Sequence, residues 1–534
     1  MPSLSDLVAY ARFAVGLPRA LRYRLSPEES RGIVQERLRQ RSQMLLDLLE
    51  RRVYAVPSSP YRELLRNAGC ELGDAQRLIV EEGVEGALGV LRDEGVYVTF
   101  EEFKGRRPIV RSGREVATDS RSFNNPRTGR YWHGSTSGST GPGTRIALDL
   151  EHLVATTPSS SVTMDAHGVL GIPAATWRTI LPGLAGVSTV LHSAMRGQPM
   201  ERWFSPVSRA EVRPSLKNRV ATEWIVAVGR LSGRRIPRPE LVPLEDAEIV
   251  ARWMHEAIRR EGACLLQAHV SCLLRAAHAA RDLGLDLSGA TFWGGGEPPT
   301  PAKVAPLLEV GGRYLSTYYM AEAGVIGLAC TAPRDATDVH VMEDSIAVIQ
   351  RPVQVSGSRQ VVQAFHFTTL LPTAPKLLFN VESDDFGILE ERVCECPLNG
   401  LGLTRHIRQV ASYRKLTGEG MSLVGTDMIR ILEEVLPRTY GGTALDFQLA
   451  QEEDADGFTK LALLVHPRLS VADESAVITT VLEELGKSDD GAELARAVWR
   501  QAGTISVRRE APRPGAMGKH APLVTLTGDP GGAR

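Results

Sequence analysis

The chain has 534 residues, 43% of them hydrophobic, and its 62 lysines and arginines nearly balance its 63 aspartates and glutamates. This length accommodates two or three domains, and the balanced charge argues against nucleic acid or another polyanion as the main partner. With six cysteines, no apolar leader and no apolar run of about eighteen residues, we expect a cytoplasmic globular protein with reduced thiols and no membrane span.

Residues 1–95 are predicted to be helical. Ser26, Pro27 and Glu29 form the pattern of a capping box with proline at the first helical position. Apolar residues then recur at helical spacing, and two further helical segments follow. Before the capping box, a mildly amphipathic and basic stretch favours a surface helix over a membrane anchor. No function follows from this region.

Residues 134–144, GSTSGSTGPGT, form the most distinctive loop of the sequence. Loops of this composition bind phosphate, because glycines let several backbone N–H groups point at one anion and Ser and Thr hydroxyls add donors. A Walker-type loop would need a Lys followed by Ser or Thr and a helix, and this stretch has no Lys. We expect the loop to join two strands. The alternative is a flexible surface turn, which is the commoner use of such a composition.

From the loop to about residue 330, apolar runs alternate with segments of helical periodicity, which is typical of an α/β sheet. Two successive strands end in turns that carry a carboxylate: Glu297 lies in GGGEP, and Glu322 lies in YYMAEAG. Because ligands bind at the carboxyl ends of strands in such sheets, both turns are candidates for a nucleotide site.

Residues 335–390 alternate as antiparallel hairpins do and end at Asp384 and Asp385. A stretch rich in charge and glycine at 409–418 predicts a domain hinge. The remainder has a compact α+β pattern and ends in PRPGAMGKHAPLV, in which Lys519 stands between glycine and histidine.

These features, in this order, resemble the adenylate-forming superfamily of acyl-CoA synthetases and carrier-protein adenylation domains. The stretches GLDLSGATFWGGGEPPTPAKV, DVHVMEDSIAVI and SDDFG are similar, more narrowly, to the phenylacetate-CoA ligase branch, and the likeness covers roughly residues 90–525. The resemblance implies an α/β fold in three parts. These are a helical region at 1–95, a large adenylate-forming domain with layered sheets and an antiparallel subdomain at 96–412, and a small, mobile α+β domain at 413–534.

The resemblance also implies roles for individual residues. The ATP phosphates would lie on the loop residues Thr136, Ser137, Gly138, Ser139, Thr140 and Gly141. Glu297 would line the adenine site, Tyr318 would stack near adenine, and Asp385 would accept both ribose hydroxyls. Arg414 would contact ribose or phosphate. Glu322 would bind Mg²⁺, and Lys519 would reach the substrate carboxylate and the α-phosphate.

The chain departs from the family pattern at several positions. Pro142 and Gly143 stand where the family often presents a lysine beside the phosphates, so a cation there comes from Arg145 or is missing. In the YYMAEAG turn, Tyr319 replaces a glycine and Ala321 replaces a threonine that contacts the α-phosphate. These departures keep open a second hypothesis, that of a non-catalytic member of the fold that binds a partner.

Two further sets of residues have both a functional and a structural interpretation. Phe292, Trp293 and Tyr319 are candidate walls of the acid pocket, which favours an aromatic substrate; the alternative is core packing. Some members of the phenylacetate-CoA ligase branch hold a structural Zn²⁺. The ligands that this resemblance implies are Cys330, His340, Cys394 and Cys396. Buried reduced thiols are the equal alternative.

The resemblance thus predicts a ligase that uses ATP and Mg²⁺ to convert a carboxylic acid, of a kind the sequence does not specify, into an acyl-adenylate. The acyl group would then pass to the thiol of CoA or of the phosphopantetheine arm of an acyl carrier protein. A third hypothesis has an amine or hydroxyl as the acceptor. The C-terminal domain would rotate about the hinge between the two steps. Homodimerisation remains open.

Overall fold

The structure is a computed structural model. It describes, as backbone or in full, residues 4–126, 129, 131–135, 138–139, 145–198, 200–206, 216–354, 361–412, 415–418, 421–424, 430–443, 446–454, 456, 458–485, 490–513 and 523–525. Within these ranges, no helix combines the length and the apolar character that a membrane crossing requires.

In the described part of the chain, twelve strands form one central sheet in the order β14-β15-β16-β17-β13-β12-β11-β10-β9-β6-β7-β8. The strands from β8 to β11 are parallel, and those from β12 to β14 pair antiparallel. The predicted α/β class, with an antiparallel part near residues 335–390, is therefore confirmed. The strands are β6 (Ala174–Trp177), β7 (Met200–Ser205), β8 (Pro239–Leu241), β9 (Cys264–His269), β10 (Ala290–Gly295), β11 (Arg313–Met320), β12 (Gly324–Ala329), β13 (Val339–Val341), β14 (Ile346–Gln354), β15 (Val361–Thr369), β16 (Val381–Glu391) and β17 (Arg405–Ser412).

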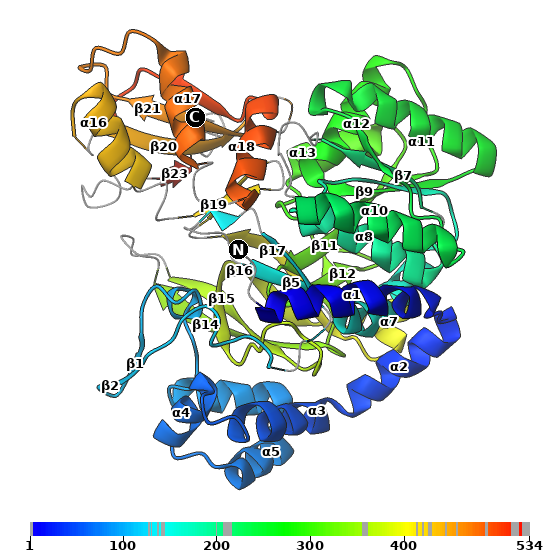
Figure 1. The fold of residues 1–534 in the computed structure, drawn as a ribbon, viewed down its shortest axis with the longest axis vertical. Helices are drawn as coiled ribbons and strands as arrows, with labels where there is room; N and C mark the ends of the chain where they lie inside the picture. Colours follow the sequence, from blue (N-terminus) through cyan, green and yellow to red (C-terminus); the bar gives the residue numbers. More distant parts are fainter. Residues whose placement is uncertain are drawn as a thin grey trace, which may run out of the picture.

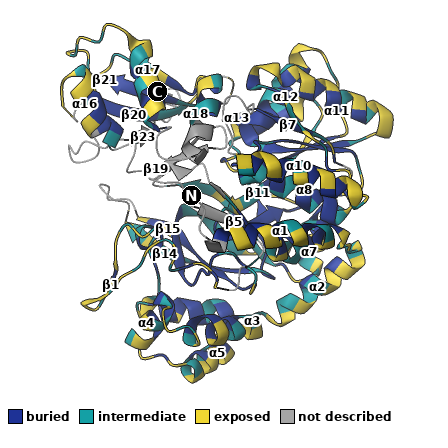
Figure 2. Ribbon diagram, viewed as in Figure 1, coloured by how far each residue is buried: buried dark blue, intermediate teal, exposed yellow. Residues whose placement is uncertain are grey.

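Helices cover both faces of the parallel strands, so these strands are continuous apolar runs rather than alternating ones. In β9, Leu265 belongs to the core cluster on one face and Leu266 to the cluster on the other. Figure 2 shows buried residues along these strands and exposed residues on the outer faces of the helices. The helices are α7 (Leu150–Ala166), α8 (Leu184–Arg196), α10 (Leu216–Leu231), η2 (Leu244–Asp246), α11 (Ala247–Glu261), α12 (Val270–Asp282), α13 (Pro301–Glu309) and the short α14 (Pro397–Gly400).

The N-terminal region is helical, as predicted. Its helices are α1 (Leu4–Arg22), α2 (Pro27–Arg39), α3 (Arg41–Leu48), η1 (Leu49–Tyr54), α4 (Pro60–Asn67), α5 (Leu72–Asp93) and α6 (Phe100–Phe103), and a hairpin of β1 (Ile109–Arg111) and β2 (Arg114–Val116) follows. The predicted capping box is present: Ser26 Oγ accepts from Glu29 N at 3.1 Å, and Glu29 Oε2 accepts from Ser26 N at 2.8 Å. Figure 1 shows α1 beside the parallel half of the sheet and α3–α5 below the antiparallel half.

The glycine-rich loop joins two strands, as predicted. β3 (Tyr131–Ser135) and β5 (Arg145–Asp149) pair antiparallel on either side of it. Within the loop, β4 (Gly138–Ser139) pairs in parallel with β19 (Met421–Val424), which forms a hairpin with β18 (Lys415–Gly418). The loop backbone therefore lies beside the segment that leads into the C-terminal residues.

The described C-terminal residues form a small α+β unit around a sheet in the order β22-β21-β20-β23. Figure 1 shows it in orange beside α12 and α13. Asp456 O lies 3.1 Å from His278 Nε2, and the Phe458 ring lies 4.3 Å from the Arg275 guanidinium carbon. The elements are η3 (Ile431–Val435), α16 (Leu436–Tyr440), β20 (Phe447–Glu453), β21 (Thr459–Val465), α17 (Glu474–Leu485), α18 (Asp490–Ala502), β22 (Ile505–Arg508) and β23 (Leu523–Thr525). The predicted domain boundaries remain a prediction.

Candidate functional site

The turns that carry Glu297 and Glu322 follow neighbouring parallel strands, β10 and β11. At the end of β10, Gly295 lies opposite His269 of β9 and Thr317 of β11. The carboxyl ends of these strands therefore meet at one edge of the sheet, where open α/β sheets bind ligands.

The carboxylate of Glu297 is fully engaged in a buried network. Ser271 Oγ donates to Glu297 Oε1 at 2.7 Å, and Lys303 Nζ lies 3.5 Å from Glu297 Oε2. Lys303 Nζ also donates to Thr459 Oγ1 of β21 at 2.7 Å. Glu297 is therefore linked through Lys303 to the C-terminal unit, and its role in lining the adenine site remains a prediction.

The carboxylate of Glu322, the predicted Mg²⁺ ligand, forms an ion pair with Lys104, which follows α6. Both side chains are largely buried. Nearby, Lys376 Nζ donates to Ser120 O at 2.5 Å and to Asn124 Oδ1 at 2.9 Å. Burial lowers the pKa of Lys376 to about 8, although the charge of Glu322 opposes this shift. Sequence reasoning missed Lys104, because it lies 218 residues from Glu322.

Tyr318 and Asp385, which the resemblance assigns to adenine and to ribose, lie together in the structure. Tyr318 OH donates to Asp385 Oδ2 at 2.8 Å. The Tyr318 ring packs against Phe365 and Phe367, with centroids 6.3 and 6.1 Å away, and its burial raises the pKa of Tyr318 well above the ordinary value. Asp385 is half-buried, whereas the adjacent Asp384 is fully buried. Of the two aspartates, Asp385 is thus the one that a ligand can reach.

The three aromatic residues predicted for the acid pocket have different environments. Phe292 has no exposed surface and packs in the core near Leu307. This burial matches the core-packing alternative, and the pocket role of Phe292 stays a prediction. Trp293 is largely buried, and its Nε1 donates to Thr317 Oγ1. Tyr319 is 49% exposed, so it alone of the three presents a substantial accessible ring.

Several predicted site residues lie outside the described residues. Gly138 and Ser139 are described only as the backbone of β4. The others of this set are Thr136, Ser137, Thr140, Gly141, Arg414 and Lys519, and their roles stay predictions.

Among the described residues, Cys330, His340, Cys394 and His406 bring their ligand atoms within 4.8 Å of one another. Cys330 Sγ lies 3.8 Å from Cys394 Sγ. Cys394 Sγ in turn lies 3.6 Å from His340 Nε2 and 3.8 Å from His406 Nε2. With Zn–S bonds of about 2.3 Å and Zn–N bonds of about 2.0 Å, a tetrahedral site spaces its ligand atoms roughly 3.5–3.8 Å apart. The donor set and its spacing fit Zn²⁺.

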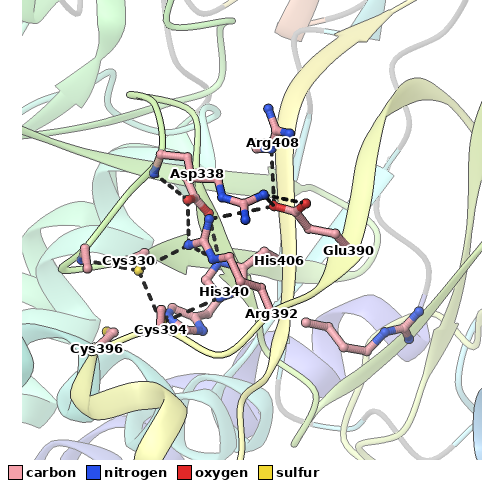
Figure 3. A network of polar contacts seen from close by, with 12 residues as sticks. Cys330, Asp338, His340, Glu390, Arg392, Cys394, Cys396, His406 and Arg408 are labelled. Carbon is pink, nitrogen blue, oxygen red and sulfur yellow. Dashed lines mark hydrogen bonds and ion pairs between the residues drawn. The ribbon is translucent and has the colours of Figure 1, made fainter.

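Hydrogen bonds on the far side of each imidazole orient the two histidines of this group. His340 Nδ1 lies 2.9 Å from Leu403 O, and His406 Nδ1 lies 2.8 Å from Asp338 Oδ1. Arg392 NH2 donates to the other carboxylate oxygen of Asp338 at 2.8 Å (Figure 3). Acceptors at Nδ1 favour the tautomer whose Nε2 binds metal, which is the usual arrangement around zinc-ligating histidines.

Cys396 is not one of these four residues, although the sequence predicted it as a ligand. Its Sγ accepts from Thr331 N at 3.4 Å. His406 completes the group instead, because β13 and β17 pair so that His340 lies opposite His406. The sequence shows a histidine after the two cysteines in CECPLNGLGLTRH, but only this strand pairing brings it to the thiols.

No family model matches the chain, and no curated protein is significantly similar to it in sequence. Among solved structures, it is similar to 2-hydroxyisobutyryl-CoA ligase in complex with 2-HIB-AMP and CoA in the thioesterification state. The TM-score is 0.52 at 14% identity, over 94% of this chain and 91% of that chain. The same ligase in the postadenylation state gives 0.41 at 14% identity, over 93% and 90%. The amide bond synthetase McbA from Marinactinospora thermotolerans gives 0.31 at 14% identity, over 95% and 98%. The chain thus has the fold of an acyl-CoA ligase over nearly its whole length.

Proposed function

We propose that the protein activates a carboxylic acid with ATP as an acyl-adenylate and then transfers the acyl group to a thiol of CoA or of a carrier protein. The observation that carries this proposal is the Tyr318–Asp385 hydrogen bond beside the Glu322 turn, in a chain with the fold of an acyl-CoA ligase. The similar structure of 2-hydroxyisobutyryl-CoA ligase contains an acyl-AMP and CoA, the two ligands that such a reaction needs.

In the first step, an oxygen of the substrate carboxylate attacks the α-phosphorus of ATP, and pyrophosphate leaves. A carboxylate is a poor electrophile, so the AMP ester supplies the leaving group for the second step. There the thiolate attacks the acyl carbon, a thioester forms and AMP departs. No side-chain nucleophile is required. Asp385 would hold both ribose hydroxyls, since a carboxylate accepts two hydrogen bonds at once.

Glu322 fits a Mg²⁺ site, because Mg²⁺ in phosphoryl-transfer enzymes is held by one or two carboxylates together with substrate phosphates. When bound, Mg²⁺ would neutralise charge on the departing pyrophosphate. Lys104 would then leave Glu322, and its ammonium group would lie beside the phosphates. It would supply the cation that the loop lacks at Pro142 and Gly143.

Cys330, His340, Cys394 and His406 would hold a structural Zn²⁺. The cysteines and histidines fill a tetrahedral coordination shell, so the ion would have no open position for substrate. Its role would be to fix the segment after β16 against β12 and β13.

The protein's activity is tested by pyrophosphate release and ATP–pyrophosphate exchange with a panel of carboxylic acids. In Asp385→Asn, we expect the KM for ATP to rise about 10- to 100-fold, the range for a hydrogen bond to a charged group. Tyr318→Phe, which keeps the carboxylate, serves as the matched control with a smaller effect.

Lys519→Ala should abolish exchange, while thioester formation from a supplied acyl-adenylate survives.

Two results would count against this function. Exchange that is unchanged in Lys519→Ala would remove the adenylation assignment. Calorimetry that detects no ATP binding to the wild type would favour the non-catalytic alternative, for which Ala321 and the Lys104-paired Glu322 are the supporting observations. Mass spectrometry of the product with thiol, amine and hydroxyl acceptors identifies the second substrate.

A further inference from the structure

Arg178 follows β6 at the carboxyl edge of the parallel strands, and its positive charge has no counter-ion among the described residues. Its NH2 group donates to Ala268 O at 3.2 Å, whereas its Nε is buried without a hydrogen-bond partner. The side chain is half-buried, and desolvation lowers the pKa of Arg178 below its ordinary value. Some other partly buried arginines of the chain have a carboxylate partner, as Arg111 has in Glu102.

A cation that is buried without a counter-anion destabilises a fold, because it loses hydration and gains no ion pair. Such a group is a candidate for a binding site, because a ligand can supply the missing charge. The planar guanidinium group is suited to a carboxylate, which it binds through two parallel hydrogen bonds.

Two other side chains at the same edge surround Arg178. His269 ends β9, and burial together with the nearby Arg178 charge lowers the pKa of His269 to about 3, so this imidazole is neutral. Its Nδ1 is buried without a hydrogen-bond partner. A Cβ atom on Gly296 would lie 2.8 Å from this nitrogen, so glycine is the residue that leaves room for the ring. The exposed ring of Tyr319, from β11, is close enough for its charge state to depend on Arg178.

We propose that Arg178 binds a second carboxylate, at the far end of the acid whose first carboxylate is adenylated. This inference rests on the proposed function and narrows its substrate to dicarboxylic acids. β6 and β11 are three strand spacings apart, about 15 Å across the sheet edge, so one acid can extend from the Glu322 turn toward Arg178. Tyr319 lies between these two points and contacts the body of the acid.

Pairs of acids that differ by one carboxylate test this proposal: terephthalate against benzoate, and adipate against hexanoate. In ATP–pyrophosphate exchange, the wild type should prefer the diacid of each pair in kcat/KM. In Arg178→Met, this preference should fall about 10- to 100-fold, mainly through KM, as expected for loss of a charge-assisted hydrogen-bonded pair. Arg178→Lys keeps the charge without the planar fork and should restore part of the preference.

Arg196 provides a matched control. It is also half-buried and forms no ion pair with the described residues, but its NH1 and NH2 groups donate to Ser160 and Ser193, and it lies in the last turn of α8. A helix C-terminus stabilises a cation, so Arg196 needs no ligand. Arg196→Met should change diacid and monoacid kinetics by the same factor.

The outcomes separate this inference from the proposed function. If the wild type exchanges pyrophosphate with monoacids and shows no diacid preference, the Arg178 assignment is overturned and the adenylation function stands. If Arg178→Met instead raises the KM for ATP by the same factor with every acid, Arg178 binds a phosphate of the nucleotide. That result would also overturn the diacid proposal. If no acid supports exchange, but calorimetry without ATP shows Arg178-dependent binding of terephthalate and not of benzoate, the diacid site stands and the adenylation function fails.

Discussion

Lys104 is the residue that most changes the interpretation of the nucleotide site. The phosphate loop has no lysine, so the sequence left its cation to Arg145 or missing, and the structure brings an ammonium group to the predicted metal ligand Glu322. Their side chains are 11% and 8% exposed, so neither charge is well hydrated. Breaking a buried pair by removing one partner costs about 3–5 kcal/mol, and Lys376 near Glu322 offsets part of that cost here.

We therefore expect Lys104→Met to lower the free energy of unfolding by about 3 kcal/mol, and Mg²⁺ to recover part of this loss by taking the place of the ammonium group. Denaturant unfolding with and without Mg²⁺ measures both effects. Arg77→Met is the control: its pair with Asp74 is exposed, so the cost should stay below about 1 kcal/mol and be independent of Mg²⁺. A Lys104→Met protein that Mg²⁺ does not stabilise would contradict a metal-binding role for Glu322.

The surroundings of a predicted site residue depend on how its strand packs and pairs, which the local sequence does not show. ATFWGG was correctly interpreted as a strand, β10, but the sequence could not show which face each aromatic residue takes. Helices cover both faces of this central strand, so all its side chains are apolar or small and no alternation marks the ligand side. For this reason the sequence left both interpretations of Phe292 open, as a pocket wall or as a core residue. His406 was missed because its approach to His340 depends on pairing of β13 with β17, a contact between distant segments.

Metal content tests the four-residue group at the element level. His406→Ala and Cys330→Ser should each reduce bound zinc from about one equivalent to a small fraction, because a structural site needs all four ligands. Cys396→Ser should retain it, since Cys396 contacts Cys330 and His340 but is not one of the four residues whose ligand atoms all lie within 4.8 Å of one another. Elemental analysis of the purified proteins gives the ratio. Zinc that is lost from Cys396→Ser and retained by His406→Ala would restore the ligand set predicted from the sequence.

At the scale of the whole molecule, the sequence predicted the α/β class and the α+β C-terminal unit. Both follow from hydrophobic periodicity and turn residues, which can be identified within short segments of the chain. The contacts between the C-terminal unit and the central sheet cannot be predicted from any short segment. Lys303 illustrates this: it is a lysine in α13, yet its side chain is 1% exposed and bridges Glu297 to Thr459. No short sequence pattern predicts a contact between a helix and a strand whose residues are 156 positions apart.

The bond between Lys303 and Thr459 belongs to one arrangement of the C-terminal unit. If the unit rotates between the two half-reactions, this bond exists in one arrangement and is absent from the other. Thr459→Val removes a hydrogen bond to a charged group from the first arrangement alone, so it should shift the population by about tenfold or more toward the second. We therefore expect one half-reaction to accelerate and the other to slow, measured as pyrophosphate exchange and as thioester formation from a supplied acyl-adenylate. Thr504→Val is the matched control, because Thr504 is equally buried but its Oγ1 has no hydrogen-bond partner. Equal changes in both half-reactions of Thr459→Val would indicate a fixed C-terminal unit.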